Sequence, residues 1–451
     1  MPLAVQARAA SARPKPHTDA NPIGRDAFAA AMARFAPFED NPTLAVAVSG
    51  GRDSVALVLL AAHWAALRGG VAVGVTVDHR LRPESADEAA QVSGWLAGYG
   101  IAHHTLTWAD RPGPQGPVMA GSEAAARDAR YKLLEDFCRT RGILHLLIGH
   151  HRADQAETQA IRRTRASGVI GRAGMPAVRE LAHVRVLRPF LAFPRKQITA
   201  TLEAYDQPWI DDPSNYDMRF ARARIRAVKD PPRVDSAAGA ERQAVEREVA
   251  RLGARAVALH PAGYARVEAD ILRPINDFEV VRRIFANLLT CIGGSVYPPR
   301  GARLDRLVRL VMTGDIRGGV TLGGCTVRRD PDGRVRVARE LAGITAPREL
   351  SAGQPLESVT PWDGRFRILG VPAGTQLGAA GHFRAMGLPE HLDFRGYTGV
   401  PDDVWMALPA LCSDGRYRVC APAPVLEGDE MTPQARFSPV FPLAGAIFAT
   451  S

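Results

Sequence analysis

The stretch Thr43-Leu-Ala-Val-Ala-Val-Ser-Gly-Gly-Arg-Asp-Ser54 decides the fold of this 451-residue chain. An apolar run rich in β-branched residues over 44–48 predicts a buried strand, and the apolar run from Val55 predicts a helix. A sharp turn lies between them at Gly50 and Gly51. Glycines permit positive φ and remove the Cβ atoms that would keep backbone N–H groups away from an anion. Strand, glycine-rich turn and helix in this order therefore predict a phosphate site at the start of the helix.

The polar side chains of the turn agree with a phosphate site. Ser49 and Ser54 offer hydroxyl donors, and Asp53 offers a carboxylate for a magnesium ion that would screen phosphate charge. An ordinary tight turn with helix caps is the alternative, but a turn between a buried strand and a long helix favours phosphate. The turn has neither the Gly-Lys-Ser/Thr of a Walker A loop nor the spacing of a Rossmann fingerprint.

Composition limits the class of protein. Lys and Arg number 57 against 47 Asp and Glu, a net charge of +10, which suits nucleic acid, anionic lipid or a solvated basic surface. No apolar run reaches the roughly 18 residues of a membrane-spanning helix, so no membrane association is expected. The five cysteines are scattered and form no C-x-x-C pair, which argues against a zinc ribbon, an iron–sulfur site or a disulfide framework. A reducing cytoplasm fits this usage.

Strand and helix patterns alternate after the turn. The apolar pattern predicts strands over 71–77, 101–108 and 143–148, and helices over 85–99 and 122–141. Alternation at this spacing predicts an α/β fold with a doubly wound parallel sheet, whose ligands bind at the carboxyl ends of the strands. The glycine turn, Asp78-His79 and Gly149-His150-His151 fall at such ends.

Four regions are expected along the chain. Residues 1–40 form a variable N-terminal extension, and residues 41–230 form the α/β domain that carries the turn. After a proline-containing linker, residues 236–345 form a mainly helical middle domain, with helices over 241–252, 278–289 and 304–312 and a hairpin at Asp332-Gly333. Residues 346–451 form a β-rich domain of short strands broken by glycine and proline.

Further candidate residues each have a structural alternative. On a helix, His150 and Asp154 (i, i+4) and Asp154 and Glu157 (i, i+3) could share one face and hold a metal; no cysteine joins them, so magnesium suits the set better than zinc. Asp78 and His79 could instead be a strand-end cap and a surface histidine. The remaining candidates are basic and could be solvated or contact RNA phosphates; they are Arg127 and Arg130 on one helix face, and the arginine-rich segment 161–229 with Arg222 and Arg226.

Several motifs resemble one family. The turn Ser49-Gly-Gly-Arg-Asp-Ser54 is similar to the S-G-G-x-D-S loop of the N-type ATP pyrophosphatases, or PP-loop superfamily. Within that superfamily, the chain from about 40 to 230 resembles the tRNA(Ile)-lysidine synthases. The matching elements are Val77-Asp-His-Arg-Leu-Arg82, Ala125-Ala-Arg-Asp-Ala-Arg-Tyr131, Gly149-His-His-Arg-Ala-Asp-Gln-Ala-Glu-Thr158 and Trp209-Ile-Asp-Asp-Pro-Ser-Asn215.

The resemblance implies an activity. ATP would adenylate the C2 oxygen of the wobble cytidine in a tRNA(Ile) with a CAU anticodon, and free lysine would displace AMP to give lysidine. ATP and Mg²⁺ are the implied cofactors, and the family suggests a monomer or a homodimer whose C-terminal regions bind tRNA. The roles implied for residues are ATP binding by Ser49, Gly50, Gly51, Arg52, Asp53, Ser54, Asp78 and His79; Mg²⁺ binding by Asp53 and Asp154; lysine binding by Glu157; and substrate or RNA contact by Arg127, Arg130, His150, His151, Arg222 and Arg226.

Two positions depart from the family pattern. Ala153 stands where the family has the first of two aspartates, and Ala223 stands where it has asparagine. These departures leave open an RNA-binding PP-loop protein with impaired catalysis. A tRNA thiolase of the same superfamily is the other alternative, although thiolases that use paired cysteines need a C-x-x-C that this chain lacks.

Overall fold

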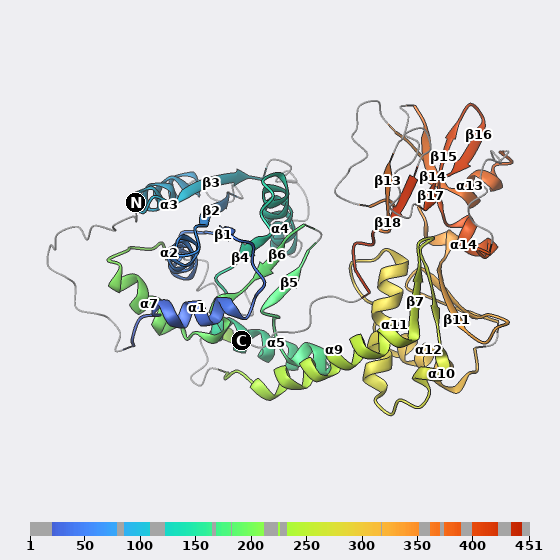
Figure 1. Cartoon of the computed structure of the whole chain (residues 1–451), viewed down its shortest axis with the longest axis horizontal. Helices are drawn as coiled ribbons and strands as arrows, with labels where there is room; N and C mark the ends of the chain where they lie inside the picture. The colour runs from blue at the N-terminus through green and yellow to red at the C-terminus, as the bar shows by residue number, and fades with distance from the viewer. Residues whose placement is uncertain are drawn as a thin grey trace. The chain divides into compact units, whose positions relative to one another are not determined.

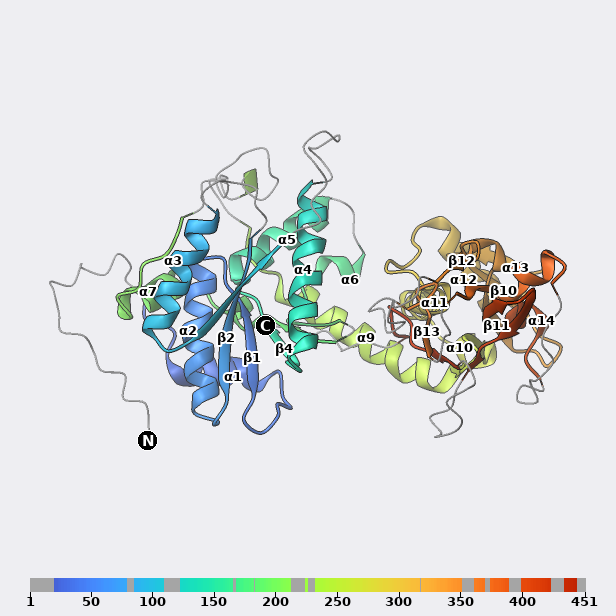
Figure 2. The same cartoon turned by 90° about the horizontal axis from the view of Figure 1, so that it is seen from above.

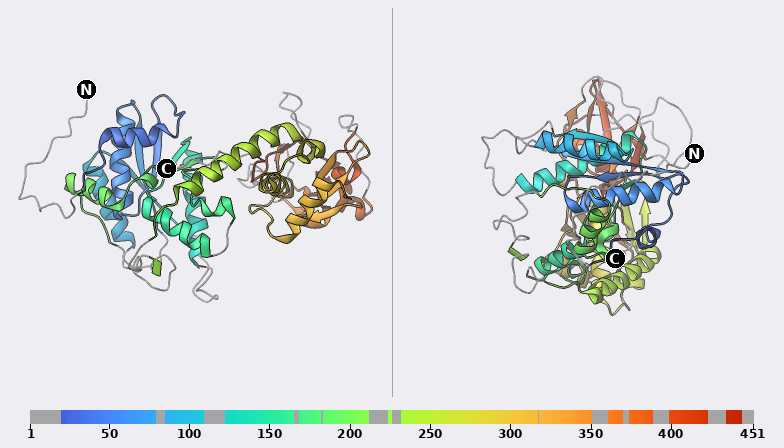
Figure 3. Two further views of the ribbon diagram at one scale, coloured as in Figure 1. Left: turned by 90° about the horizontal axis from the view of Figure 1, so that it is seen from below. Right: turned by 90° about the vertical axis from the view of Figure 1, so that its left-hand side faces the viewer.

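The computed structural model describes residues 20–78, 85–108, 122–164, 168–181, 183–211, 224–225, 232–316, 318–350, 361–369, 374–388, 399–422 and 434–443. The chain divides into two compact units, residues 1–244 with 446–451 and residues 245–445 (Figure 1). The boundary falls inside helix α9 (Ser236–Ala256), which is continuous (Figure 3). Each unit is described separately below.

A six-stranded sheet forms the centre of the first unit, in the order β3-β2-β1-β4-β6-β5. All neighbouring pairs are parallel except β5–β6, so only the edge strand β5 runs in the opposite direction. The strands are β1 (Thr43–Ala47), β2 (Val71–Asp78), β3 (Ala102–Thr107), β4 (His145–Leu147), β5 (Val178–Glu180) and β6 (Arg185–Leu187). The predicted parallel α/β sheet is confirmed.

Helices cover both faces of this sheet (Figure 2). One face carries α1 (Arg25–Ala33), α2 (Arg52–Ala66), α3 (Ser85–Gly98) and α7 (Arg195–Ala204), whose buried side chains share one apolar cluster. The other face carries α4 (Ser122–Thr140), which packs Leu134 and Phe137 against Val75 and Val186. No helix among the described residues has the length and apolar character needed to cross a membrane.

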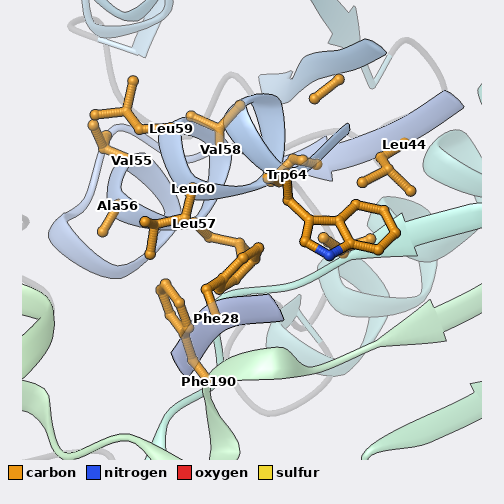
Figure 4. Packing of buried hydrophobic residues seen from close by; sticks show 14 of the residues in the cluster. Phe28, Leu44, Val55, Ala56, Leu57, Val58, Leu59, Leu60, Trp64 and Phe190 are labelled. Atoms are coloured by element: carbon orange, nitrogen blue, oxygen red, sulfur yellow. The ribbon is translucent and has the colours of Figure 1, made fainter. Parts of the chain in front are cut away.

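Helix α2 is the most deeply buried helix of this unit, because the sheet lies on one side of it and α1 and α7 lie on the other (Figure 4). Phe28 of α1 meets Phe190 edge to face, with ring centroids 6.1 Å apart. Burial of each such large apolar side chain stabilises the fold by about 1.5–3 kcal/mol. This packing fixes the position of the start of α2 and of the glycine turn before it.

The order of strands places a topological switch point at the turn. Strand β1 has β2 on one side and β4 on the other, so the connections that leave β1 and β4 diverge at their carboxyl ends. Open α/β sheets bind ligands at such a switch point. The turn after β1 and the loop before α5 (Arg152–Thr164) both lie there.

The second unit begins with helices and an antiparallel sheet. The helices are the end of α9, then α10 (Ala269–Leu272), α11 (Phe278–Gly293) and α12 (Ala302–Thr313). The sheet has the order β7-β8-β11-β10-β9; its strands are β7 (Val257–His260), β8 (Tyr264–Val267), β9 (Val320–Leu322), β10 (Cys325–Arg329) and β11 (Val335–Arg339). The sequence pattern predicted the β10–β11 hairpin, with Gly333 at φ 87°, but not the outer strands. Those strands have three or four residues each, too few to show a clear alternation.

Two smaller sheets follow, which confirms the β-rich C-terminal region. One has the order β12-β14-β15-β16 and the other β13-β18-β17. The strands are β12 (Arg348–Glu349), β13 (Phe366–Leu369), β14 (Gln376–Ala379), β15 (Pro409–Ser413), β16 (Arg416–Val419), β17 (Ala421–Pro422) and β18 (Gln434–Phe437). The short helix η3 (Leu341–Gly343) precedes β12, and the short helices α13 (Ala380–Ala385) and α14 (Asp402–Met406) lie between β14 and β15 in the chain.

A buried ion cluster joins parts of this unit. The Asp363 carboxylate accepts from Arg339 at 2.8 and 2.9 Å and from Arg365 at 2.7 Å. Arg365 also donates to the Ala407 carbonyl at 2.9 Å. The Arg365 side chain is only 1% exposed, and burial lowers its pKa to about 10 although Asp363 opposes this shift. One carboxylate thus compensates two buried cations.

Candidate active site

The glycine turn is stabilised by hydrogen bonds of its own serine hydroxyl. The Ser54 hydroxyl donates to the Gly51 carbonyl at 2.9 Å and accepts from the Ser49 N–H at 3.1 Å. Gly50 has φ 80°, in the left-handed region that favours glycine, and Gly51 is extended immediately before α2. The backbone at the start of α2 therefore has the conformation expected of a phosphate-binding turn.

A later segment packs on the turn. The Ile210 N–H donates to the Gly50 carbonyl at 2.9 Å, and a Cβ on Gly50 would lie 2.7 Å from the Ile210 Cδ1 atom. The Arg52 guanidinium lies 5.1 Å from the centroid of the Trp209 ring and 3.6 Å from Asp211. The start of the Trp209-Ile-Asp motif thus supports the turn, a contact that the sequence alone did not reveal.

Two carboxylates meet beside the turn. The Nε2 atom of His151 lies 3.7 Å from the Asp53 carboxylate and 3.7 Å from the Asp154 carboxylate. A Cβ on Gly149 would lie 3.0 Å from the backbone of Asp53, so only glycine lets this loop approach the start of α2 so closely. The strand ends predicted to meet therefore bring Asp53 and Asp154 together.

The His151 ring is fixed by the start of α5. The Ala153 N–H donates to His151 Nδ1 at 3.1 Å, so the neutral ring carries its proton on Nε2, the atom that faces both carboxylates. The Asp154 carboxylate accepts from the His151 N–H at 3.0 Å, as in a reciprocal capping box. His151 was expected to contact substrate or RNA. Its side chain is only 4% exposed and its Nε2 atom faces both carboxylates, so we expect it to act on the carboxylate pair.

The charges and the unpartnered oxygen beside the turn suit a bound cation. Burial raises the pKa of Asp53, and nearby Asp154 raises it further, while His151 and Arg195 act in the opposite direction. The buried Oδ1 atom of Asp53 has no hydrogen-bond partner among the described residues. A hard cation would satisfy that oxygen and offset the repulsion between the carboxylates. The described residues hold no cluster of three or more metal-ligating side chains, so phosphate oxygens and water would supply the other ligands, as Mg²⁺ prefers.

The other acidic candidates, Glu157 and Asp78, are both buried. Glu157 is buried one turn after Asp154 on α5. Asp78 is buried at the end of β2, and its carbonyl accepts from the Trp108 N–H at 3.1 Å. His79 lies outside the described residues.

The basic candidates have different environments. His150 Nδ1 accepts from the Arg188 Nε–H group at 3.3 Å. Arg127 and Arg130 are exposed on α4, and Arg127 lies against the Tyr131 ring. Arg222 and Arg226 lie outside the described residues. Sequence reasoning missed Arg195, the first residue of α7, whose charge acts on Asp53; its place in an arginine-rich segment gave no signal of this role.

The departure at Ala153 falls away from the carboxylate pair. Ala153 is exposed, whereas Asp154 is 7% exposed and contacts His151. We therefore expect the substitution Ala153→Asp to change the rate of ATP-dependent AMP formation by less than about threefold, because surface substitutions away from special contacts have small effects. Steady-state AMP release measures this effect. A gain of tenfold or more would mean that the second carboxylate belongs to the site.

The switch-point sheet, the Ser49–Ser54 turn and the paired carboxylates define a PP-loop ATP-binding domain. Residues 25–230 match the family model described as the PP-loop domain. The chain is 34% identical to the tRNA(Ile)-lysidine synthase of Ruegeria pomeroyi over 84% of this chain and 88% of that protein. It is 33% identical to that of Rhizobium meliloti over 79% and 81%, and 43% identical to that of Rhodopseudomonas palustris over 45% and 58%. The chain belongs to the tRNA(Ile)-lysidine synthase family, and it uses ATP.

Proposed function

We propose that this enzyme joins free lysine to C2 of the wobble cytidine of a tRNA(Ile) with a CAU anticodon, with ATP converted to AMP and pyrophosphate. The observation that carries the proposal is the Asp53–His151–Asp154 arrangement directly beside the phosphate-binding turn. Family membership indicates the class of substrate, and the arrangement supports the binding of ATP phosphates with a metal ion.

The first step activates the base. The C2 oxygen of cytidine attacks the α-phosphorus of ATP, a P–O bond forms, and the bond to the β-phosphate oxygen breaks to release pyrophosphate. The backbone N–H groups of the Ser49–Ser54 turn and the start of α2 bind the phosphates. Asp53 and Asp154 would hold Mg²⁺, which when bound neutralises charge on the phosphates. Asp78 and His79 lie near the nucleotide in this proposal.

The second step forms the C–N bond. The ε-amine of lysine attacks C2 and AMP leaves with the oxygen. At pH 7 a lysine with pKa near 10.4 must first lose a proton, at a cost of roughly 4.6 kcal/mol. Buried Glu157 would bind the lysine ammonium, and a carboxylate of the site would accept the proton.

Binding of the tRNA requires contacts beyond the catalytic centre. We assign Arg127, Arg130, His150, Arg222 and Arg226 to contacts with RNA, and the region from 236 onward to binding of the tRNA body. The proposal places the enzyme in the cytoplasm as a monomer or a homodimer.

An incorporation assay tests the proposal. Purified protein is incubated with ATP, Mg²⁺, radiolabelled lysine and either tRNA(Ile) with a CAU anticodon or tRNA(Met), which shares those anticodon letters. We expect label and AMP with tRNA(Ile) and background label with tRNA(Met). Binding of tRNA(Ile) without label or AMP would favour the RNA-binding alternative with impaired catalysis.

A further inference from the structure

Two arginines flank one tyrosine, and a third, buried arginine lies close to them near the carboxyl edge of the sheet. The Arg127 and Arg179 guanidinium carbons lie 5.3 and 5.4 Å from the centroid of the Tyr131 ring. Arg188, the residue after β6, lies near enough for Tyr131 to raise its pKa and for Arg127 and Arg179 to lower it. The three side chains come from α4, β5 and the end of β6, so the tertiary fold brings them together. We call Arg127, Arg179, Arg188 and Tyr131 the arginine cluster.

The charge of the cluster is not balanced by a direct ion pair in the part of the chain that the structure describes. None of its arginines forms an ion pair with Asp or Glu among the described residues. Arg188 is 4% exposed, and among the described residues its guanidinium donates to two uncharged groups, the Pro176 carbonyl at 2.8 Å and His150 Nδ1 at 3.3 Å. Burial lowers the pKa of Arg188, and Arg179 and Arg127 lower it further, so the three cations act on one another.

Packing alone does not account for this arrangement. Stacking on a tyrosine ring stabilises a guanidinium, but the ring has no net charge to offset three cations. A buried cation without a counterion is costly to fold, so an anion supplied from outside the chain would relieve the cost. Arg127 and Arg179 are exposed and open the cluster to such an anion.

The position of the cluster indicates which anion. Arg188 follows β6 and His150 follows β4, at the carboxyl edge of the sheet where the phosphate-binding turn also lies. His150 adjoins His151, which contacts both site carboxylates. The arginine fork matches the oxygens of a phosphate group.

We propose that the arginine cluster is a second phosphate-binding site, which holds a backbone phosphate of the RNA beside the nucleotide that is modified. This inference rests on the proposed function for the identity of the RNA. The phosphates of ATP are the other source of the same chemistry, and the experiment separates the two.

The test uses the double substitution Arg127→Gln with Arg179→Gln, both at exposed positions. Binding of tRNA(Ile) is measured without lysine at several salt concentrations, and the KM for ATP is measured separately. We expect weaker tRNA binding, an unchanged KM for ATP, and a salt dependence whose slope is smaller by about 0.7, the value for one lost phosphate contact to a single strand.

Arg141→Gln is the matched control. Arg141 is exposed just after α4, and its guanidinium lies 4.1 Å from the centroid of the Phe137 ring, which matches the stacking of Arg127 without membership of the cluster. This control is expected to leave the slope unchanged. An equal loss with Arg141→Gln, or no loss with the double variant, would overturn the site. A raised KM for ATP with normal tRNA binding would overturn the assignment to RNA and give the cluster to the nucleotide. Because binding is measured without lysine, failure of lysidine synthesis would not affect this result.

Discussion

The substitution Asp53→Asn is expected to abolish AMP formation, with a loss of at least about 10³-fold, and to raise the melting temperature of the ligand-free protein. Removal of a single electrostatic contact in an active site costs about 10²–10³ in rate, and Asp53 would both hold Mg²⁺ and set the charge beside the turn. The ligand-free protein gains stability because asparagine removes a partly buried charge that repels Asp154. For a protein of this size each kcal/mol corresponds to roughly 2–4 °C.

Single-turnover AMP formation and thermal unfolding without ATP or Mg²⁺ measure the two effects. Asp26→Asn is the control, since Asp26 is exposed in the first turn of α1 and lies outside the site. It is expected to leave the AMP rate unchanged. AMP formation retained by Asp53→Asn would remove this residue from the mechanism. A lower melting temperature would show that the carboxylate stabilises the fold without a metal.

The substitution Asp363→Asn is expected to destabilise the second unit by about 3–5 kcal/mol. Loss of one partner from a buried ion pair leaves an uncompensated charge, and here it would leave two, on Arg339 and Arg365. Urea unfolding, followed by near-ultraviolet circular dichroism, measures the change. Two transitions are expected because the chain has two compact units, and only one of them should move.

Asp402→Asn is the control for Asp363→Asn, because it removes the same charge from an exposed ion pair instead of a buried one. Asp402 lies 3.6 Å from Arg384, but the two side chains are 82% and 63% exposed. Exposed ion pairs contribute about 0–1 kcal/mol, so this variant should unfold close to the wild type. Equal destabilisation by the two substitutions would show that the buried cluster has no special role.

Much of the catalytic unit could be predicted because its signals are local. Residues 43–54 contain the strand, the turn and the helix start in one continuous stretch, and the structure has all three. The predicted meeting of Asp53 with Asp154 followed from a general rule about the carboxyl ends of parallel strands. The phosphate and metal roles of these residues remain predictions.

Side-chain direction could not be predicted, and the arginines of 161–229 show why. Their number suggested RNA contacts, yet Arg162 donates to the Gly171 and Gly174 carbonyls and Arg185 donates to the Phe35 carbonyl. Arg188 is buried. The number of arginines in a segment does not show which of them bind RNA. Their carbonyl partners are brought near them only by the tertiary structure, so these contacts cannot be predicted from the sequence. The Ile210 contact with the turn escaped prediction for the same reason.

The close approach of Gly149 to Asp53 has a consequence for ion selectivity. The loop that carries Asp154 approaches the start of α2 so closely at Gly149 that a Cβ there would lie 3.0 Å from the backbone of Asp53. Two backbone segments in such close contact are not expected to adjust easily to a larger ion. Mg²⁺ requires short, nearly octahedral bonds, whereas Ca²⁺ needs longer bonds and more ligands. The glycine at 149 would therefore favour the smaller ion through stiffness of the main chain.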